Sequence, residues 1–217
     1  MNQAQQNVTQ TFNKSTIQNI IFDFGGVLLH IDFKKTHEAF EALGIQDAEA
    51  HFGQHHASDL FSRLETGHIS PEQFYDLFRA ETNTDLNNEQ IKDAWNAMLL
   101  YYAKENIALL RKLSSKYNLY LFSNTNEIHY EWFAALYQQV FDGEKLEDLF
   151  KEAWYSHEKG VRKPAASVFT YMLEKEALNA KQTLFIDDTI GNIQGAAEAG
   201  LQTHLLKSPA ELLLLDL

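Results

Sequence analysis

Short, uninterrupted apolar runs bounded by turn-forming residues are the clearest pattern along this chain. Such runs are typical of strands that are buried on both faces of a parallel sheet. The three best runs and two weaker ones are Ile20–Phe22, Leu119–Phe122 and Leu184–Ile186, then Ala153–Tyr155 and Thr203–Leu206. Helical periodicity fills the stretches around residues 105–116, 128–138, 165–176 and 190–199. This alternation predicts an α/β fold with helices on both faces of a parallel sheet.

The segment from residue 33 to residue 100 follows a different pattern, because it is helical in periodicity throughout and contains no convincing strand. One helix has a clear start: Ser70 is a suitable N-cap, and Pro71 occupies the first helical position. Phe74, Leu77 and Phe78 then share one helix face. We predict a helical insert beside the sheet. The alternative is a long crossover that packs on the sheet.

Composition and charge restrict the class of protein. The chain has 217 residues, with 18 Lys and Arg against 30 Asp and Glu, a net charge of −12 and a pI of about 5.1. This acidic balance argues against general binding to nucleic acids or anionic membranes. Cysteine is absent, which excludes disulfides, thiolate catalysis and cysteine-ligated metals.

Nothing in the hydropathy pattern points to a membrane. No apolar run approaches the roughly 18 residues that a membrane span requires. Residues 1–16 are polar, rich in Gln, Asn and Thr, and lack an apolar signal core. We therefore expect a flexible N-terminal tail and a cytoplasmic location.

Polar residues follow the predicted strands at the point where each strand ends. Asp23 follows the first run, Ser123 the second, and the pair Asp187 and Asp188 the run after those; Lys163 lies in a basic stretch near a weaker run. In an open parallel sheet, ligands bind beyond the carboxyl ends of the strands. Each residue alone also fits a helix cap or a turn. Their recurrence at one edge of the sheet predicts a functional site.

Closely packed carboxylates require a cation. Asp23, Asp187 and Asp188 supply hard oxygen ligands without His or Cys, and such donors select Mg²⁺. With a metal screening its charge, Asp23 can attack phosphorus as a covalent nucleophile. Ser123 and the backbone amides after it can donate to phosphate oxygens, and Lys163 can neutralise the transferring group.

Four segments resemble the motifs of the haloacid dehalogenase-like (HAD) hydrolase superfamily, and they occur in the family's order. They are IIFDFGGVL, LFSNTN, RKP and LFIDDTIGNIQGA. The amino-acid sequence of these motifs is similar to that of the family branch with a small helical cap. This branch includes α-D-glucose-1-phosphate phosphatases and the phosphatase domain of epoxide hydrolases. The resemblance implies a Rossmann-like core of residues 17–30 and 106–217, with the first-motif strand in its centre. It implies a helical cap of residues 31–105.

The resemblance also assigns roles to individual positions. The implied metal ligands are Asp23, the main-chain carbonyl of Gly25, Asp188 and, directly or through water, Asp187. The implied phosphate-binding residues are Ser123, Asn124, Lys163, Gly25 and Gly26. Asp23 is the implied nucleophile, Lys163 the stabilising lysine, and Asn192 a supporting residue. The implied activity is Mg²⁺-dependent hydrolysis of a small organic phosphate, with a sugar phosphate as candidate, through an aspartyl-phosphate.

Gly25 departs from the family's phosphatases, which usually carry a second Asp two positions after the nucleophile as general acid and base. Such proton transfer contributes roughly 10²–10⁴-fold to a rate. Three explanations stay open: a slow phosphatase, a proton shuttle borrowed from His30 or Asp32, or a different activity. His30 and Asp32 also fit a linker or a helix cap.

Two other classes of function stay open. Dehalogenases and phosphonoacetaldehyde hydrolases also lack the second Asp, although the family's dehalogenases lack the acidic pair Asp187 and Asp188 as well. A phosphonatase needs a cap lysine that forms an imine; Lys34 and Lys35 are candidates, with a solvated helix end as the alternative. The third class is a catalytically weak or inactive protein that binds a phosphorylated ligand. We expect a small phosphorylated metabolite as partner, and a monomer or homodimer.

Some further residues admit a functional and a structural interpretation. His51, His55 and His56 suggest a zinc site or an exposed cap helix. The candidates for substrate specificity in the cap are Phe52, His55 and Arg63. The aromatic residues expected in core or hinge packing are Trp95, Tyr101, Tyr102 and Trp154. The run Leu212–Leu215 fits packing on the sheet edge or a dimer interface.

Overall fold

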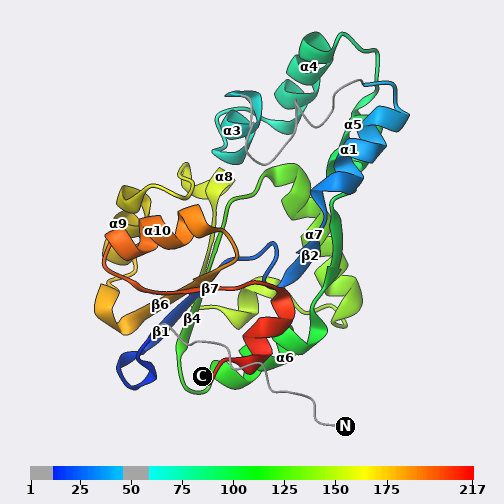
Figure 1. Cartoon of the computed structure of the whole chain (residues 1–217). Coiled ribbons are helices and arrows are strands. Elements are labelled where there is room, and N and C mark those ends of the chain that lie inside the picture. The colour runs from blue at the N-terminus through cyan, green and yellow to red at the C-terminus, as the bar shows by residue number, and fades with distance from the viewer. Residues whose placement is uncertain (1–11, 46–58) are drawn as a thin grey trace.

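A parallel sheet of five strands forms the centre of the molecule (Figure 1). The computed structural model describes residues 12–45 and 59–217. The strands, in the order β5-β4-β1-β6-β7 across the sheet, are Glu152–Tyr155, Asn118–Ser123, Asn19–Phe22, Thr183–Asp187 and Gln202–Leu205. Each neighbouring pair runs parallel. All five predicted strands are confirmed, and the first strand of the chain lies in the centre.

Helices cover both faces of this sheet because side chains alternate along a buried strand. Ile20 and Phe22 of β1 belong to the apolar cluster on one face, whereas Ile21 belongs to the cluster on the other. Residues of α6 (Lys104–Leu113) and α7 (Glu127–Val140) join the first cluster. Residues of α9 (Ala166–Lys175) and α10 (Ile190–Glu198) join the second. The predicted three-layer α/β architecture is thereby confirmed.

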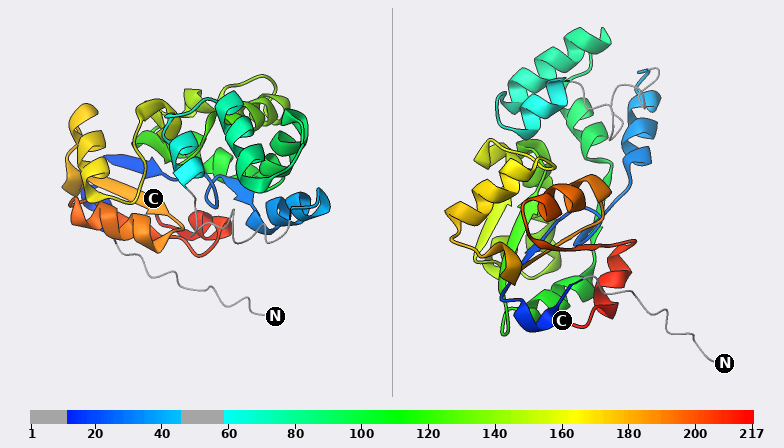
Figure 2. Two further views of the ribbon diagram at one scale, coloured as in Figure 1. Left: turned by 90° about the horizontal axis from the view of Figure 1, so that it is seen from above. Right: turned by 60° about the vertical axis from the view of Figure 1, so that its left-hand side comes forward.

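Between residues 33 and 96, the described part of the chain forms four helices that occupy one end of the molecule (Figures 1 and 2). They are α1 (Phe33–Ala42), α3 (Asp59–Glu65), α4 (Pro71–Thr82) and α5 (Asn88–Asn96). They lie beyond the carboxyl ends of the strands, not across a sheet face. The apolar cluster of the first face continues into them through Phe40, Phe61, Phe74 and Trp95. We call these four helices the inserted helices.

Helix α4 begins at the position that Ser70 and Pro71 predicted. The Ser70 hydroxyl accepts from the Gln73 backbone N–H at 3.3 Å, and the Gln73 side chain accepts from the Ser70 N–H at 3.0 Å. This reciprocal capping satisfies two backbone donors that a helix start otherwise leaves unpaired. Phe74 and Phe78 are fully buried on the predicted face.

A short antiparallel ribbon connects the inserted helices to the sheet, and sequence analysis did not predict it. Its strands are β2 (Leu29–Ile31) and β3 (Leu99–Tyr102), with Leu29 opposite Tyr102 and Ile31 opposite Leu99. The strand β3 begins inside the segment that we interpreted as wholly helical. Its apolar residues directly continue the helical pattern of α5, so periodicity alone does not separate the two elements.

The remaining elements of the described residues are short. They are the single-turn helix α8 (Ser156–Lys159) and the 3₁₀ helices η1 (Lys14–Thr16), η2 (Leu146–Leu149), η3 (Ala180–Gln182) and η4 (Pro209–Leu214). Within the part of the chain that the structure describes, no helix combines the length and the apolarity that crossing a bilayer demands.

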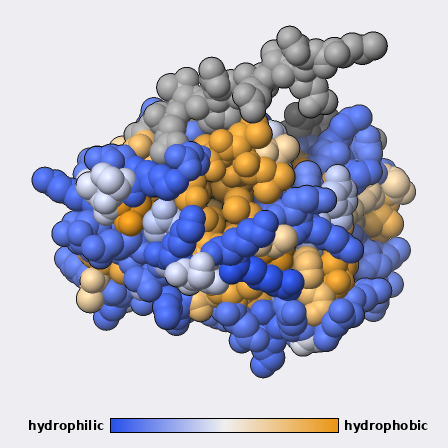
Figure 3. Space-filling view, turned by 90° about the horizontal axis from the view of Figure 1, so that it is seen from below, coloured by the Kyte–Doolittle hydropathy of each residue, from blue (hydrophilic) through white to orange (hydrophobic). Residues whose placement is uncertain are grey.

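The C-terminal leucine run divides between the interior and the surface. Leu212 is fully buried in the first-face cluster, and Asn106 of α6 donates to the Pro209 carbonyl at 2.9 Å. Leu213 and Leu214 are 46% and 60% exposed. The underside of the molecule, seen in Figure 3, carries an apolar area among mostly hydrophilic residues. The sheet-edge and dimer interpretations of this run both stay predictions.

Candidate active site

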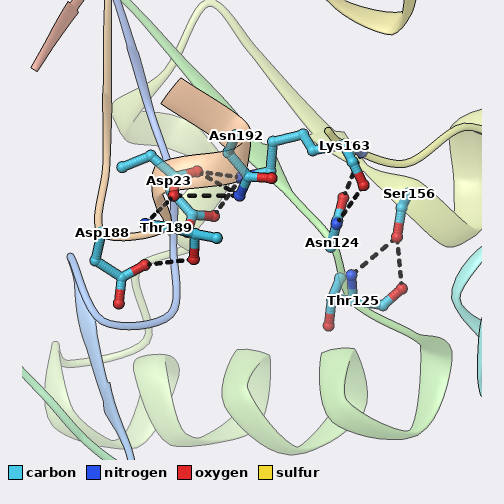
Figure 4. Close-up of polar contacts among 9 residues, drawn as sticks. Asp23, Asn124, Thr125, Ser156, Lys163, Asp188, Thr189 and Asn192 are labelled. Atoms are coloured by element: carbon cyan, nitrogen blue, oxygen red, sulfur yellow. Dashed lines mark hydrogen bonds and ion pairs between the residues drawn. The ribbon is translucent and has the colours of Figure 1, made fainter. Parts of the chain in front are cut away.

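Three adjacent strands bring acidic and hydroxyl side chains to one edge of the sheet. Ser123 ends β4, Asp187 ends β6, and Asp23 directly follows β1 between them. Lys163 reaches the same edge from the loop between α8 and α9, and Asp188 follows β6 (Figure 4). All of these except Asp187 line a cavity of about 580 Å³. The predicted convergence of these side chains is therefore observed.

Lys163 connects the two buried carboxylates. Its Nζ donates to Asp23 Oδ1 at 2.7 Å and to Asp187 Oδ2 at 2.8 Å. Lys163 is 1% exposed, and its Nζ lies 5.4 Å and 5.3 Å from the ring centroids of Phe122 and Phe185. A charged amine so deeply buried is stable only beside paired anions and aromatic faces.

The electrostatics of the site show a shortage of positive charge. Burial and, next, the Asp187 carboxylate raise the pKa of Asp23 to about 7, although Lys163 opposes this shift. Burial and Asp187 also raise the pKa of Asp188. Burial disfavours the charged form of Lys163, but the carboxylates of Asp187 and Asp23 outweigh it and raise its pKa. One lysine thus does not balance three carboxyl groups.

A bound divalent cation would supply the positive charge that the three carboxyl groups lack. Asp23, Asp187 and Asp188 each offer one oxygen, and these oxygens lie within 4.8 Å of one another. A bound cation favours the ionised form of each carboxyl group, which burial alone disfavours. Oxygen donors without His or Cys are those that a hard ion such as Mg²⁺ or Ca²⁺ prefers.

Asp187 is held more firmly than the other two acids. Its Oδ1 accepts from the Thr189 backbone N–H at 2.7 Å and from Asn192 Nδ2 at 3.2 Å. Its Oδ2 accepts from Asn192 Nδ2 at 2.9 Å and from Lys163. Because protein donors engage both oxygens, this arrangement favours the expectation that Asp187 reaches a metal through water. Asn192 contacts both oxygens of Asp187, and its supporting role stays a prediction.

Two glycines after Asp23 allow the backbone to approach the acids. Gly26 has a φ of +74°, and an ideal Cβ there would lie 2.0 Å from Asp188 Oδ2. Any side chain at Gly26 would therefore displace Asp188, in addition to the strain of a left-handed backbone. An ideal Cβ at Gly25 would lie 3.1 Å from Ile31 Cδ1, which is a movable side-chain atom. Gly25 also lines the cavity.

Asn124 is engaged with the backbone of Lys163. Its Nδ2 donates to the Lys163 carbonyl at 3.1 Å, and its Oδ1 accepts from the Lys163 N–H at 2.9 Å. This reciprocal pair fixes the loop that presents the lysine. Ser123 is buried and lines the cavity beside Asn124. Direct contact of Ser123 or Asn124 with a phosphoryl group stays a prediction.

The inserted helices and their linker supply the opposite wall of the cavity. Its lining residues there are Ile31, Phe33, Phe61, Glu65 and Trp95. Sequence analysis assigned no site role to Phe61 or Glu65, because nothing in a helical pattern tells which residues face a distant strand end. Trp95 was expected in core or hinge packing, and it is buried and stacks on His129 of α7 at a centroid distance of 4.9 Å. It therefore serves both the core and the cavity wall.

Several alternative site residues lie elsewhere. Asp32 caps α1 by accepting from the Lys34 N–H at 3.1 Å, and His30 stacks on Tyr101 at 4.4 Å. Lys34 is exposed and pairs with Glu38 at 3.0 Å. Arg63 is exposed and does not line the cavity. These positions match their structural interpretations: a helix cap, a linker and solvated helix ends.

The remaining candidates are divided between the core and an undescribed segment. Trp154 is buried, and its Nε1 donates to Glu176 at 2.8 Å. Tyr102 is buried like Trp95 and Trp154, whereas Tyr101 is 58% exposed, so the expected core packing does not hold for Tyr101. Lys35 is exposed and outside the cavity lining. The other candidates, His51, Phe52, His55 and His56, lie outside the described residues.

The chain is similar to known hydrolases. The family described as haloacid dehalogenase-like hydrolase matches residues 17–200 of the chain. The D-ribitol-5-phosphate phosphatase of Bacteroides thetaiotaomicron is 32% identical over 195 residues, which cover 90% of this chain and 94% of that protein.

Two solved structures share the whole fold. A variant of a HAD family enzyme from Bacteroides thetaiotaomicron, in complex with magnesium and inorganic phosphate, has a TM-score of 0.84 and 34% identity. The similarity covers 88% of this chain and 95% of that one. A HAD-like family hydrolase from Porphyromonas gingivalis has a TM-score of 0.80 and 30% identity, covering 88% of this chain and 91% of that one.

Proposed function

This chain belongs to the haloacid dehalogenase-like hydrolase family, and we propose that it is a Mg²⁺-dependent phosphatase of small organic phosphates. The observation that carries the proposal is the cluster of Asp23, Asp187 and Asp188 around Lys163 at the end of the central strand. Carboxylates and a lysine without a histidine or cysteine suit metal-assisted chemistry at phosphorus. Mg²⁺ would be held by Asp23, Asp188 and the Gly25 carbonyl, and it would screen charge between the carboxylates and the phosphate.

In the proposed reaction, an Asp23 carboxylate oxygen attacks phosphorus. The bond from phosphorus to the ester oxygen breaks, and the alcohol leaves with a proton from water. A water molecule then hydrolyses the aspartyl-phosphate, which regenerates Asp23 and releases inorganic phosphate. Lys163, already hydrogen-bonded to Asp23, orients this carboxylate and offers positive charge to the phosphoryl oxygens.

The other residues of the proposed site bind or position. The Ser123 hydroxyl and the Gly25 N–H donate to phosphoryl oxygens, and Asn124 fixes the Lys163 backbone. Gly26, whose N–H donates to the Leu29 carbonyl at 2.9 Å, lets the backbone approach the site. Asn192 and Thr189 hold Asp187, which in turn holds Lys163. The inserted helices act as a cap of residues 31–105 over a core of residues 17–30 and 106–217, and they exclude water from the cavity.

A small phosphorylated metabolite is the proposed substrate class. The similar protein from Bacteroides thetaiotaomicron is named for D-ribitol 5-phosphate, a sugar-alcohol phosphate. A cavity of about 580 Å³ is within the usual range for a small-molecule site. The dehalogenase and phosphonatase alternatives are less well supported, since the three-acid cluster suits a metal and neither Lys34 nor Lys35 lines the cavity.

The direct test is hydrolysis of p-nitrophenyl phosphate and of D-ribitol 5-phosphate, with Mg²⁺ and with EDTA. We expect turnover that requires Mg²⁺ and that falls at least about a thousandfold in Asp23→Asn, because loss of a nucleophile commonly removes most of a rate enhancement. Asp148→Asn is the control, since Asp148 is an exposed acid outside the cavity lining. Equal activity of Asp23→Asn and the parent protein would refute the nucleophile.

A further inference from the structure

A charged pair spans the cavity wall from the inserted helices to the catalytic loop. Arg162 Nη2 lies 2.9 Å from Glu65 Oε2, and both residues line the cavity. Glu65 ends α3, whereas Arg162 directly precedes Lys163. The pair therefore stands beside the point where an ester bound at Lys163 would extend its alcohol group.

This pair does not satisfy its own hydrogen-bonding groups. Arg162 Nε is buried and has no hydrogen-bond partner among the described residues. Glu65 Oε2 is buried too, and its contact with Arg162 is an ion pair without the geometry of a hydrogen bond. Burial raises the pKa of Glu65, and Arg162 counters that shift. The two side chains are still 34% and 20% exposed, and both line the cavity. Buried polar groups without partners are the groups that a ligand satisfies most favourably.

Glu65 is held at the cavity independently of its contact with Arg162. Gly67 follows α3 closely, has a φ of +66°, and an ideal Cβ there would lie 2.2 Å from the His157 carbonyl oxygen. The backbone after α3 thus packs directly on α8. Phe61, one turn before Glu65, is buried and packs against Trp95 at a centroid distance of 4.6 Å. Changing one member of the charged pair therefore leaves the helix anchored.

The chemistry of the pair suits adjacent hydroxyl groups. A hydroxyl both donates and accepts, so one can donate to the Glu65 carboxylate while its neighbour accepts from the Arg162 guanidinium. Hydrogen bonds to charged groups are stronger than those between neutral groups. The remaining lining of the inserted helices and their linker is mostly apolar, with Ile31, Phe33 and Phe61. Trp95 completes it, and its buried indole N–H has no hydrogen-bond partner among the described residues.

We propose that Glu65 and Arg162 form a subsite that binds vicinal hydroxyl groups of the leaving alcohol, so that the enzyme prefers phosphate esters of polyols. This rests on the proposed phosphatase function and deepens it. Neither residue takes part in bond breaking. Both are specificity-determining residues, which discriminate a polyol phosphate from an alkyl phosphate of the same length.

Binding of two matched ligands tests the subsite. D-ribitol 5-phosphate and n-pentyl phosphate share a five-carbon chain and a phosphate, and only the former carries hydroxyls. Isothermal titration with Mg²⁺ present gives both dissociation constants in the Asp23→Asn background, where turnover does not consume the ligand. The same measurement in Glu65→Gln and Arg162→Lys, each added to that background, gives the change in preference.

We expect at least tenfold tighter binding of ribitol phosphate than of pentyl phosphate, and a tenfold or larger fall of this preference in each of the two variants. The control is Glu152→Gln, which breaks a similar ion pair, Lys159 with Glu152 at 2.8 Å, outside the cavity lining. It should keep the preference.

Two outcomes overturn the subsite. One is a starting protein without a preference; the other is equal loss of affinity for both ligands in the variants, which indicates a structural link between α3 and the loop. Failure of the phosphatase function is seen separately, as absence of Mg²⁺-dependent turnover in the protein with Asp23 intact. The binding preference remains measurable in that case, and its presence or absence still decides the subsite.

Discussion

At the scale of single residues, the site depends on one lysine shared between two carboxylates. Lys163 bonds to Asp23 and Asp187, and burial makes each of these charges dependent on the others. Asn192 and the Thr189 N–H hold the Asp187 carboxylate, and this carboxylate in turn positions Lys163. Gly25 stands where the resemblance to the family's phosphatases led us to expect a second Asp.

Gly25→Asp should raise turnover if a proton shuttle is all that the site lacks. The new Cβ meets Ile31 Cδ1 at 3.1 Å, which requires a shift of a few tenths of an ångström by a movable side chain. We expect an increase in kcat of roughly 10- to 100-fold for D-ribitol 5-phosphate, because its poor leaving group needs protonation. Steady-state kinetics at saturating Mg²⁺ measures this.

Gly25→Asn is the matched control for that substitution. It has nearly the same size as Asp but neither donates nor accepts a proton as an acid and base. If Asn raises kcat as much as Asp does, improved packing explains the gain and the shuttle interpretation fails.

At the scale of elements, two junctions hold the site together. The first joins the inserted helix α5 to α7, where His129 stacks on Trp95 and its Nδ1 lies 2.8 Å from Asn96 Oδ1. The second joins α10 to the loop that carries Lys163. The first junction is buried on both sides, whereas the second sets the buried Gly195 against Pro164, which is exposed.

The first junction should make the protein sensitive to acid. Burial lowers the pKa of His129 from 6.5 to about 3. Between pH 6.5 and pH 3, His129 therefore binds a proton in the unfolded chain but stays neutral in the folded chain. Stability contributed by neutral His129 is present above pH 6.5 and decreases by roughly 1.4 kcal/mol for each pH unit below it.

His129→Gln should consequently lose less stability than the parent protein between pH 7 and pH 5. Urea denaturation of both proteins at each pH measures the two free energies of unfolding. Other groups titrate equally in both proteins, so the difference isolates His129. Parallel losses in the two proteins would contradict the burial argument.

The second junction predicts that Gly195→Ala destabilises the protein and impairs its activity. An ideal Cβ at Gly195 would lie 1.7 Å from the Pro164 carbonyl oxygen, a backbone atom of the loop directly after Lys163. Such overpacking typically reduces stability by about 1–3 kcal/mol. We expect this loss in the free energy of unfolding, together with a lower kcat as Lys163 shifts.

Gly191→Ala provides the comparison on the same helix. Its ideal Cβ would lie 4.0 Å from Pro164 Cβ, an ordinary contact. Stability of Gly191→Ala close to that of the parent protein would separate the steric effect from a general effect of alanine in α10. A stable, fully active Gly195→Ala protein would show that the loop adapts.

At the scale of the whole molecule, one apolar cluster extends from the first face of the sheet into the inserted helices. The cavity lies between the strand ends and these helices, so both parts contribute to its wall. The acids of the site are concentrated there as well, and their mutual repulsion opposes folding until a cation neutralises it.

Mg²⁺ should therefore stabilise the folded protein as a whole. At a Mg²⁺ concentration a hundred times the dissociation constant, the expected gain is about 2.7 kcal/mol. Thermal unfolding with Mg²⁺ and with EDTA measures it as a shift in Tm. The shift should be much smaller in Asp188→Asn, whereas Asp148→Asn, an exposed acid elsewhere, should retain it. Equal shifts in all three proteins would refute binding at the cluster.

The sequence by itself determined the five-stranded parallel core and the residues at its edge. Continuous apolar runs can be recognised in the sequence because both faces of each strand are buried. The carboxyl ends of parallel strands necessarily lie at the same edge of the sheet. This is why Asp23, Ser123 and Asp187 were predicted together. The capping residues Ser70 and Asp32 could also be recognised from the sequence, because local hydrogen bonds determine where a helix begins.

Only the tertiary structure decided which parts of the inserted helices face the site. The ribbon of β2 and β3 continues a helical pattern, and its pairing depends on a partner strand distant in the sequence. Glu65 and Arg162 meet for the same kind of reason, through the packing of α3 on α8. Local periodicity fixes which face of an element is buried, but the neighbour that covers this face is chosen by long-range packing.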